Sequence, residues 1–151
     1  MKKLGLIAAL LIIIFPSCNK EKYSSIPYAP VYLRIDLSFL DRDLAPMLAT
    51  KTFTTPRQHS DKLGFGGILV INGYSTDGEI NLYAFDLACP VESDEDIVRV
   101  IPDEEGNATC PQCKETYIIR SGTGIPTKGS KYALRSYSVR PAGYNKYIIS
   151  N

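Results

Sequence analysis

Apolar and polar residues alternate along several short stretches of the chain, which is the pattern of half-buried β-strands. The clearest case is residues 31–37, Val-Tyr-Leu-Arg-Ile-Asp-Leu. Residues 38–63 allow either a helical turn or a packed loop, and no amphipathic helix of ordinary length stands out. Apolar stretches bounded by Gly, Asn and Asp turns predict further strands at 66–72, 80–87, 98–101, 116–119, 132–139 and 144–149. The chain is therefore expected to be all-β, an antiparallel sandwich or barrel.

The first residues have the pattern of an export signal. Two lysines at positions 2 and 3 precede an apolar run over residues 4–15 that only Gly5 interrupts. A membrane span takes about 20 apolar residues, so this run fits the hydrophobic part of a signal peptide instead. The run ends in Phe-Pro-Ser-Cys, which resembles the lipobox of bacterial lipoproteins and places Cys18 directly after the cleavage point. An ordinary secretory signal with an unrelated cysteine is the alternative.

The lipobox resemblance implies both an organisation and a location. Residues 1–17 are then the signal peptide, Cys18 carries acyl chains, residues 18–30 form a polar tether, and residues 31–151 form the β domain. The partner of Cys18 is the lipid bilayer, so the mature protein is expected in the cell envelope as a membrane-anchored lipoprotein. The pattern does not separate inner from outer membrane. Disulfides can form in such a compartment.

Composition narrows the function classes. The chain of 151 residues has 17 Lys and Arg against 16 Asp and Glu, and it shows no basic stripe, so nucleic acid is not an expected partner. Ten tyrosines and no tryptophan accompany many Val, Ile and Gly, which agrees with β structure. No Ser/His/Asp set, phosphate-binding glycine loop or flavin or haem motif is visible, so nothing indicates an enzyme. The sequence points to no particular protein partner.

Two matched cysteine loops carry the candidate chemistry. Residues 89–92 read Cys-Pro-Val-Glu and residues 110–113 read Cys-Pro-Gln-Cys. Loops of this kind form metal knuckles, whose backbone N–H groups point at the thiolates, and two of them can close a tetrahedral site. Cys89, Cys110, Cys113 and Glu92 would be the ligands. A disulfide or free thiols, a single zinc or iron ion, and an iron–sulfur cluster all stay open.

The segment from residue 64 to the end resembles Rieske ferredoxin domains. The hairpin Gly-Ile-Leu-Val-Ile-Asn (67–72) and Asn-Leu-Tyr-Ala-Phe-Asp-Leu-Ala-Cys-Pro (81–90) resembles the approach to their first cluster loop, and Cys-Pro-Gln-Cys-Lys-Glu-Thr-Tyr (110–117) resembles the second. The stretches 121–131 and 134–139 resemble the glycine-proline loop and the strand that follows. The resemblance implies a Rieske-like β fold, with a small subdomain at about 88–119 that carries both loops. It is nearest to bacterial lipoproteins with altered loops.

Departures from the family motif fall on the ligands. A Rieske centre uses two cysteines and two histidines. The cysteines correspond to Cys89 and Cys110, but the histidines correspond to Val91, which cannot bind metal, and to Cys113. His59, the single histidine, precedes both loops and is interpreted as a surface residue. An orthodox 2Fe–2S cluster is therefore not supported.

Three smaller features accompany this motif. Lys114 and Glu115 replace the glycine and serine that usually follow. Tyr117 is interpreted as an inward strand residue, although a tyrosine there could hydrogen-bond a ligand. The acidic run at 92–96 is interpreted as a solvated turn rather than a cation site.

The sequence supports two functional interpretations. The first, which ligand chemistry favours, is a non-catalytic envelope lipoprotein without a cofactor, whose loops are held by a disulfide. The implied loop arrangement together with chain entropy predicts that Cys89 and Cys110 pair, a bond that contributes roughly 3 kcal/mol, and that Cys113 stays free. The alternative is an electron-transfer or metal-binding module that uses Cys89, Cys110 and Cys113, with a 2Fe–2S cluster or a single zinc or iron ion.

Overall fold

The computed structural model describes residues 25–74, 77, 79–92 and 96–151. Its regular elements, in chain order, are β1 (Val31–Asp36), the 3₁₀ turn η1 (Arg42–Leu44), β2 (Thr50–Phe53), β3 (Lys62–Leu63), β4 (Ile68–Asn72), β5 (Leu82–Asp86), β6 (Ile101–Pro102), β7 (Asn107–Thr109), β8 (Thr116–Ile118), β9 (Ile125–Pro126), β10 (Ser136–Pro141) and β11 (Lys146–Ser150). Among the described residues no helix has both the length and the apolar character needed to cross a membrane.

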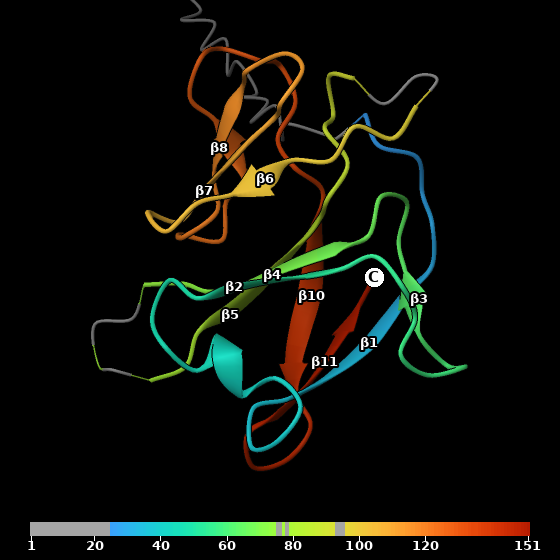
Figure 1. Cartoon of the computed structure of the whole chain (residues 1–151), viewed down its shortest axis with the longest axis vertical. Helices are drawn as coiled ribbons and strands as arrows, with labels where there is room; N and C mark the ends of the chain where they lie inside the picture. Colours follow the sequence, from blue (N-terminus) through green and yellow to red (C-terminus); the bar gives the residue numbers. More distant parts are fainter. Residues whose placement is uncertain (1–24, 75–76, 78, 93–95) are drawn as a thin grey trace, which may run out of the picture.

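Two antiparallel sheets make up this structure. The larger sheet has seven strands in the order β2-β4-β5-β10-β11-β1-β3 and curls into a barrel-like layer, while β6, β7, β8 and β9 form a small sheet at one end (Figure 1). The small sheet and the loops around it carry all three cysteines of the described residues. The predicted all-β class, with a main sheet and a small two-loop subdomain, is confirmed.

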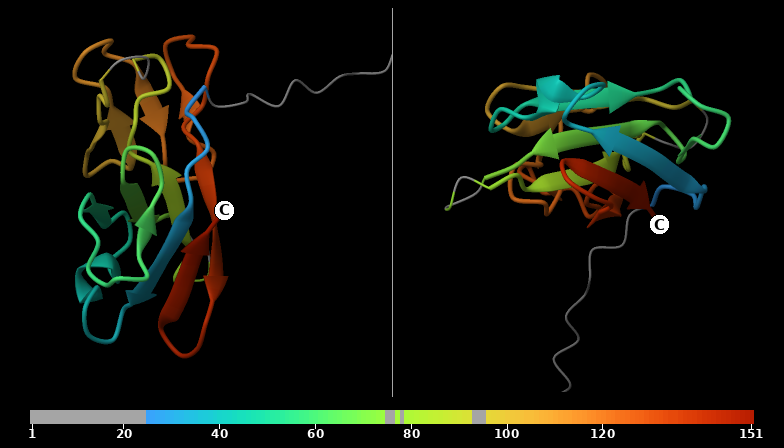
Figure 2. Two further views of the ribbon diagram at one scale, coloured as in Figure 1. Left: turned by 90° about the vertical axis from the view of Figure 1, so that its right-hand side faces the viewer. Right: turned by 90° about the horizontal axis from the view of Figure 1, so that it is seen from below.

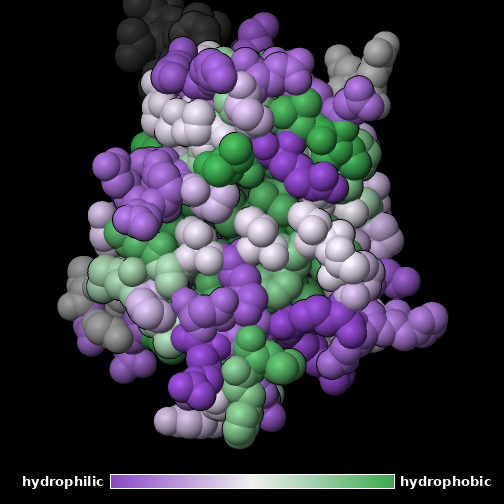
Figure 3. Space-filling view, viewed as in Figure 1, coloured by the Kyte–Doolittle hydropathy of each residue, from purple (hydrophilic) through white to green (hydrophobic). Residues whose placement is uncertain are grey.

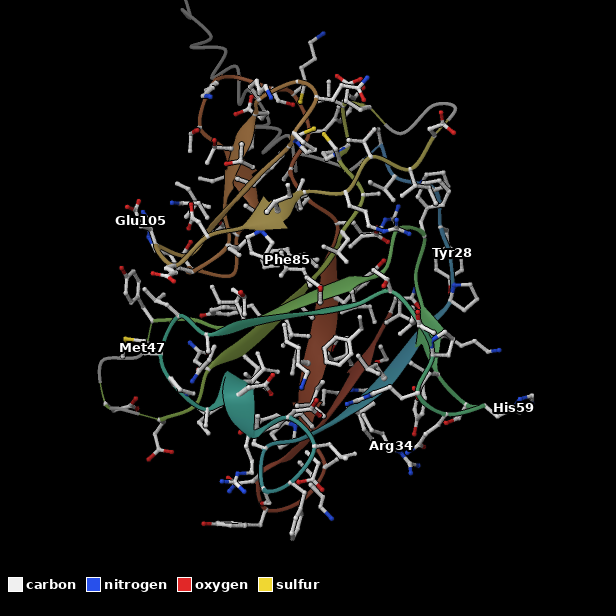
Figure 4. All side chains as sticks on the ribbon, in the orientation of Figure 1. Tyr28, Arg34, Met47, His59, Phe85 and Glu105 are labelled. Carbon is white, nitrogen blue, oxygen red and sulfur yellow. The ribbon has the colours of Figure 1, made fainter. Side chains whose placement is uncertain are left out.

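Strand β4 shows how the sequence builds both layers. All five of its residues are buried, because Ile68 and Val70 face the core of the larger sheet while Leu69 and Ile71 face the core beneath the small sheet. Phe85, from the neighbouring strand β5, belongs to the second core and lies between the two sheets (Figure 4). Strand β1 instead alternates buried and more exposed positions, as a strand with one buried face does. The cysteine subdomain therefore packs on a continuous apolar surface that β4 and β5 provide.

The predicted strands and the observed ones agree at seven places. Segments 31–37, 66–72, 80–87, 98–101, 116–119, 132–139 and 144–149 overlap β1, β4, β5, β6, β8, β10 and β11. Within residues 38–63 the structure has η1 and the short strands β2 and β3. Two further short strands, β7 and β9, pair with β8 and had no clear alternation of their own.

The start of the described chain lies at the same end as the small sheet (Figure 2). Ile26 is buried there, and Arg135 donates a hydrogen bond from Nη2 to its carbonyl oxygen (2.6 Å). Ala29 accepts a hydrogen bond from the side chain of Asn151 (2.7 Å). Residues 25–30, expected to belong to the tether, thus lie against the domain. The predicted signal peptide and Cys18 lie outside the described residues.

The exposed surface mixes polar and apolar side chains. Figure 3 shows them interspersed over one face, with a small apolar cluster at the end opposite the small sheet. Phe39 and Leu40, in the loop after β1, are among the most exposed large apolar residues, at 77% and 66%. This cluster therefore lies far from the cysteine loops.

Candidate metal centre

The first cysteine loop begins at the end of β5 and is fixed by a buried carboxylate. Cys89 is fully buried, and its N–H donates to the carbonyl oxygen of Val98 (2.7 Å). Three residues earlier, Asp86 is also fully buried, and Tyr137 donates its hydroxyl to Oδ2 at 2.5 Å. The same carboxylate accepts hydrogen bonds at 2.8–2.9 Å from the backbone N–H groups of Phe65, Gly66 and Ala88. The loop thus starts from a rigid support.

The second loop is a tight turn between β7 and β8. The N–H of Cys110 donates to the carbonyl oxygen of Glu115 (2.9 Å), and the N–H of Lys114 donates to that of Cys110 (3.1 Å). Lys114 closes the turn with a φ of 62°, a left-handed conformation that favours glycine. Lys114 therefore adopts a backbone conformation that a glycine would accommodate at a lower cost.

Backbone N–H groups within each loop point at the cysteine sulfurs. Cys89 accepts from Val91 and Glu92, Cys110 from Gln112 and Cys113, and Cys113 from Glu115. Such bonds stabilise a thiolate more than a neutral thiol, because the acceptor is charged. The two loops therefore have the local geometry of metal knuckles.

The three cysteine sulfurs converge although two of the cysteines lie more than 20 residues from the third. All three Sγ atoms lie within 4.8 Å of one another, and those of Cys89 and Cys113 are 3.7 Å apart. Bonds of 2.3 Å to one tetrahedral zinc ion would place two sulfurs about 3.8 Å apart. The sulfurs are free thiols in this structure, and their spacing suits a single soft metal ion.

Ionisation within the group is uneven. Burial raises the pKa of the Cys89 thiol and raises the pKa of Cys113 to about 12. Burial also opposes ionisation of Cys110, but the N–H groups of Cys113 and Gln112 outweigh it and hold the pKa of Cys110 below its ordinary value. Ionisation is therefore favoured at Cys110 over Cys89 and Cys113, and a nearby cation would favour the charged form of all three thiols.

Tyr117 joins the group from β8. The side chain is fully buried, and its hydroxyl lies 3.6 Å from the Sγ of Cys89. Burial and the neighbouring Cys89 raise the pKa of Tyr117, so the hydroxyl keeps its proton and can donate to the sulfur. The prediction of an inward-facing strand residue is confirmed, and the residue contacts a candidate ligand as well.

Glu92, the fourth ligand candidate from the sequence, stands apart from the sulfurs, as do His59 and Val91. The carboxylate of Glu92 accepts a hydrogen bond from the side chain of Gln112 (3.0 Å), which links the two loops, but Glu92 is not part of the group of side chains that lie within 4.8 Å. His59 is an exposed residue of the loop before β3, far from the small sheet (Figure 4). Val91 is 43% exposed and offers no ligand atom.

Glu115 is a feature that the sequence did not single out as functional. It is buried, and its Oε1 accepts backbone hydrogen bonds at 2.8–3.2 Å from one residue of β8 and two residues of the loop after β9, with a fourth, at 3.1 Å, on Oε2. The donors are Thr116, Thr127, Lys128 and Ser130. Burial alone would raise the pKa of Glu115, but these N–H groups outweigh it and lower the pKa. The carboxylate therefore clamps residues 127–130 against the second cysteine loop.

The residues present do not fit a Rieske cluster. Such a cluster needs two histidines on its second iron, and the described residues offer three sulfurs and no imidazole near them. The three sulfurs also lie within reach of one ion. A single ion bound by thiolates fits this donor set, since Cys ligands select zinc and other soft metals.

No family model and no curated protein matches the chain. Among solved structures, the chain is similar to the ferredoxin of carbazole 1,9a-dioxygenase from Nocardioides aromaticivorans IC177, with a TM-score of 0.46 and 19% identity over 79% of this chain and 96% of that one. It is also similar to a chain from a complex of reduced oxygenase and oxidized ferredoxin in carbazole 1,9a-dioxygenase, with a TM-score of 0.45 and 13% identity over 80% and 93%.

Proposed function

We propose that this protein is a membrane-anchored envelope lipoprotein that binds one soft metal ion, of the zinc class, through the thiolates of Cys89, Cys110 and Cys113. The observation that carries the proposal is the convergence of the three sulfurs within 4.8 Å. Among the described residues the sulfur group offers no ligands for a second metal, which favours a single-ion binding site over an electron-transfer cluster.

The hydrogen bonds around the sulfurs favour this function over a disulfide-held loop pair. A disulfide sulfur carries no charge and gains little from N–H donors, whereas thiolates on a metal gain from each of them. Here all three cysteines accept such bonds, and Tyr117 supplies a further donor to Cys89. Metal binding would also remove the proton from each thiol, which overcomes the raised pKa of Cys89 and Cys113.

Attachment to a membrane is the second part of the proposal. Its support is the lipobox at residues 15–18 together with Ser25, whose hydroxyl donates to the carbonyl oxygen of Pro90 in the first cysteine loop. Six residues separate Cys18 from Ser25, and seven peptide links span at most about 25 Å. An acylated Cys18 would therefore hold the metal site close to the bilayer surface.

Cobalt titration of the full-length protein tests the metal site. The protein is purified in detergent, reduced and freed of metal without oxygen, and then titrated with Co²⁺ followed by Zn²⁺. We expect one equivalent of Co²⁺ to give intense thiolate-to-cobalt absorption, which Zn²⁺ then abolishes. Cys89→Ser, Cys110→Ser and Cys113→Ser should each weaken binding by about 100-fold or more, since structural zinc sites are worth about 10–16 kcal/mol in total.

Glu92→Gln is the matched control, because Glu92 lies on the same loops and is not part of the sulfur group. It should bind Co²⁺ like the wild type. Absence of thiolate absorption, or cysteine variants that bind as well as the control, would refute the proposed site. Iron and sulfide in equal stoichiometric amounts in the isolated protein would show a cluster instead.

A further inference from the structure

A cavity of about 560 Å³ opens beside the three sulfurs, and its walls include Cys113, the partly exposed member of the group. Cys89 and Cys110, both fully buried, do not line it. The other walls come from the start of the described chain, the first cysteine loop, the clamp residue Glu115 and the loop before β10: Ser25, Pro90, Val91, Glu115, Gly129, Ser130, Lys131 and Tyr132. The metal site therefore has one open side.

No described acidic, histidine or further cysteine side chain is placed to complete a four-coordinate site. Glu115 faces the cavity, but four backbone N–H groups occupy its carboxylate. Glu92 is bound to Gln112. A metal ion with three protein ligands keeps its fourth position for water or for a molecule from outside, as catalytic zinc sites do.

We infer that this cavity admits a small anionic thiol, such as a mercaptocarboxylate, as the fourth ligand of the ion on the three cysteines. The inference rests on the proposed metal site. On binding, the thiol would release its proton to solvent, and its sulfur would take the place of a water on the ion. No oxidation would be needed, because a proton and a water molecule are all that is released.

The walls of the cavity indicate this class of thiol. Pro90, Val91 and Tyr132 give an apolar side suited to a short carbon chain. Lys131 lines the same cavity, is exposed, and makes no ion pair within the described part of the chain. Its ammonium group can therefore bind the carboxylate of a ligand whose sulfur is on the metal.

The Co²⁺-loaded protein reports on the fourth position directly, because replacing an oxygen ligand by sulfur shifts the cobalt ligand-field bands. We expect ethanethiol and mercaptoacetate each to shift these bands in a saturable way, while acetate leaves them unchanged. Lys131→Gln should weaken the binding of mercaptoacetate by about two- to fivefold, which is the effect of losing one exposed ion pair. The binding of ethanethiol should stay unchanged. Lys128→Gln is the matched control, since Lys128 is not a wall residue and its Nζ donates to the carbonyl oxygen of Lys114 (2.6 Å).

The outcomes separate this inference from the proposed function. If the protein shows thiolate-to-cobalt absorption but added thiols do not shift the bands, the metal site is supported and the open fourth position is refuted. Thiols that strip the cobalt, so that the thiolate absorption disappears, also overturn it. Equal weakening by Lys128→Gln and Lys131→Gln refutes the role of Lys131. Absence of cobalt–thiolate absorption from the start refutes the metal site itself, and the fourth ligand with it.

Discussion

Glu115→Gln should destabilise the cysteine subdomain, because the substitution removes the charge that holds residues 127–130. The carboxylate accepts three N–H groups on Oε1 and one on Oε2. A hydrogen bond to a charged acceptor contributes about 1.5–3 kcal/mol and a neutral one about 1 kcal/mol, so the three bonds on Oε1 weaken together by more than 1 kcal/mol. The new amide also places a donor against the N–H of Ser130, which costs about 1–3 kcal/mol.

The total expected loss in the free energy of unfolding is about 2–4 kcal/mol, or a fall in Tm of about 10 °C for a domain of this size. Thermal and urea unfolding at pH 7, followed by circular dichroism, measure it. Glu92→Gln provides the control with the same change of charge, because Glu92 accepts a hydrogen bond from the side chain of Gln112 near the surface. That variant should stay within about 0.5 kcal/mol of the wild type.

The pH dependence gives a second test of the clamp. The folded pKa of Glu115 lies below the unfolded value, so its contribution is fully present above about pH 4.3 and is lost as pH falls below that value. The difference in the free energy of unfolding between the wild type and Glu115→Gln should therefore be constant from pH 7 to pH 5 and decrease towards pH 3. A variant as stable as wild type at pH 7, or a difference that does not change in acid, would refute this role of Glu115.

Four further outcomes are expected. Tyr137→Phe removes the buried hydrogen bond to Asp86 and should cost about 1.5–3 kcal/mol in chemical unfolding; an unchanged stability would contradict it. Lys114→Gly relieves the φ of 62° and should raise Tm by a few degrees, since a left-handed residue costs about 1–2 kcal/mol, and a lower Tm would speak against that strain. Cys18→Ala should move the protein from the membrane to the soluble exported fraction, and a variant found wholly in the membrane would exclude the lipobox. In metal-free, air-oxidised protein, non-reducing peptide mapping should find Cys89 in the disulfide, and a bond that omits it would contradict the observed convergence.

Much of the larger sheet could be predicted because its strands carry their own pattern. The segments that became β1, β4 and β5 combine apolar residues with bounding turns, so propensity and burial agree there. The strands β3 and β9 have two residues each, and no periodicity can be read from two residues. They exist because a neighbouring strand offers hydrogen-bond partners, as β8 does for β9, which is tertiary information.

The residues of the candidate metal site likewise include some that the sequence indicates and one that it does not. Cys89, Cys110 and Cys113 could be predicted from the sequence, because cysteines in two short loops of this kind are typical metal ligands. Glu115 was not, since an isolated glutamate after a cysteine loop has no pattern that shows which N–H groups will reach it. Its donors at 127–130 come from a loop whose path depends on the whole subdomain.

The pairing of the thiols shows where sequence reasoning reaches its limit. Loop-closure entropy favours a bond from Cys89 to either member of the second loop over one between Cys110 and Cys113. It does not choose between Cys110 and Cys113 as the partner, because the two closed loops differ by only three residues and both are worth about 3 kcal/mol. The structure places the sulfur of Cys113 3.7 Å from that of Cys89 and Cys110 within the same group, so both bonds are within reach of small side-chain movements. The spacing of the sulfurs, all within 4.8 Å of one another, therefore does not exclude either bond from Cys89 to the second loop. Convergence of all three sulfurs, and not of one pair alone, is expected of three ligands around one ion, and it is a further reason to propose metal binding.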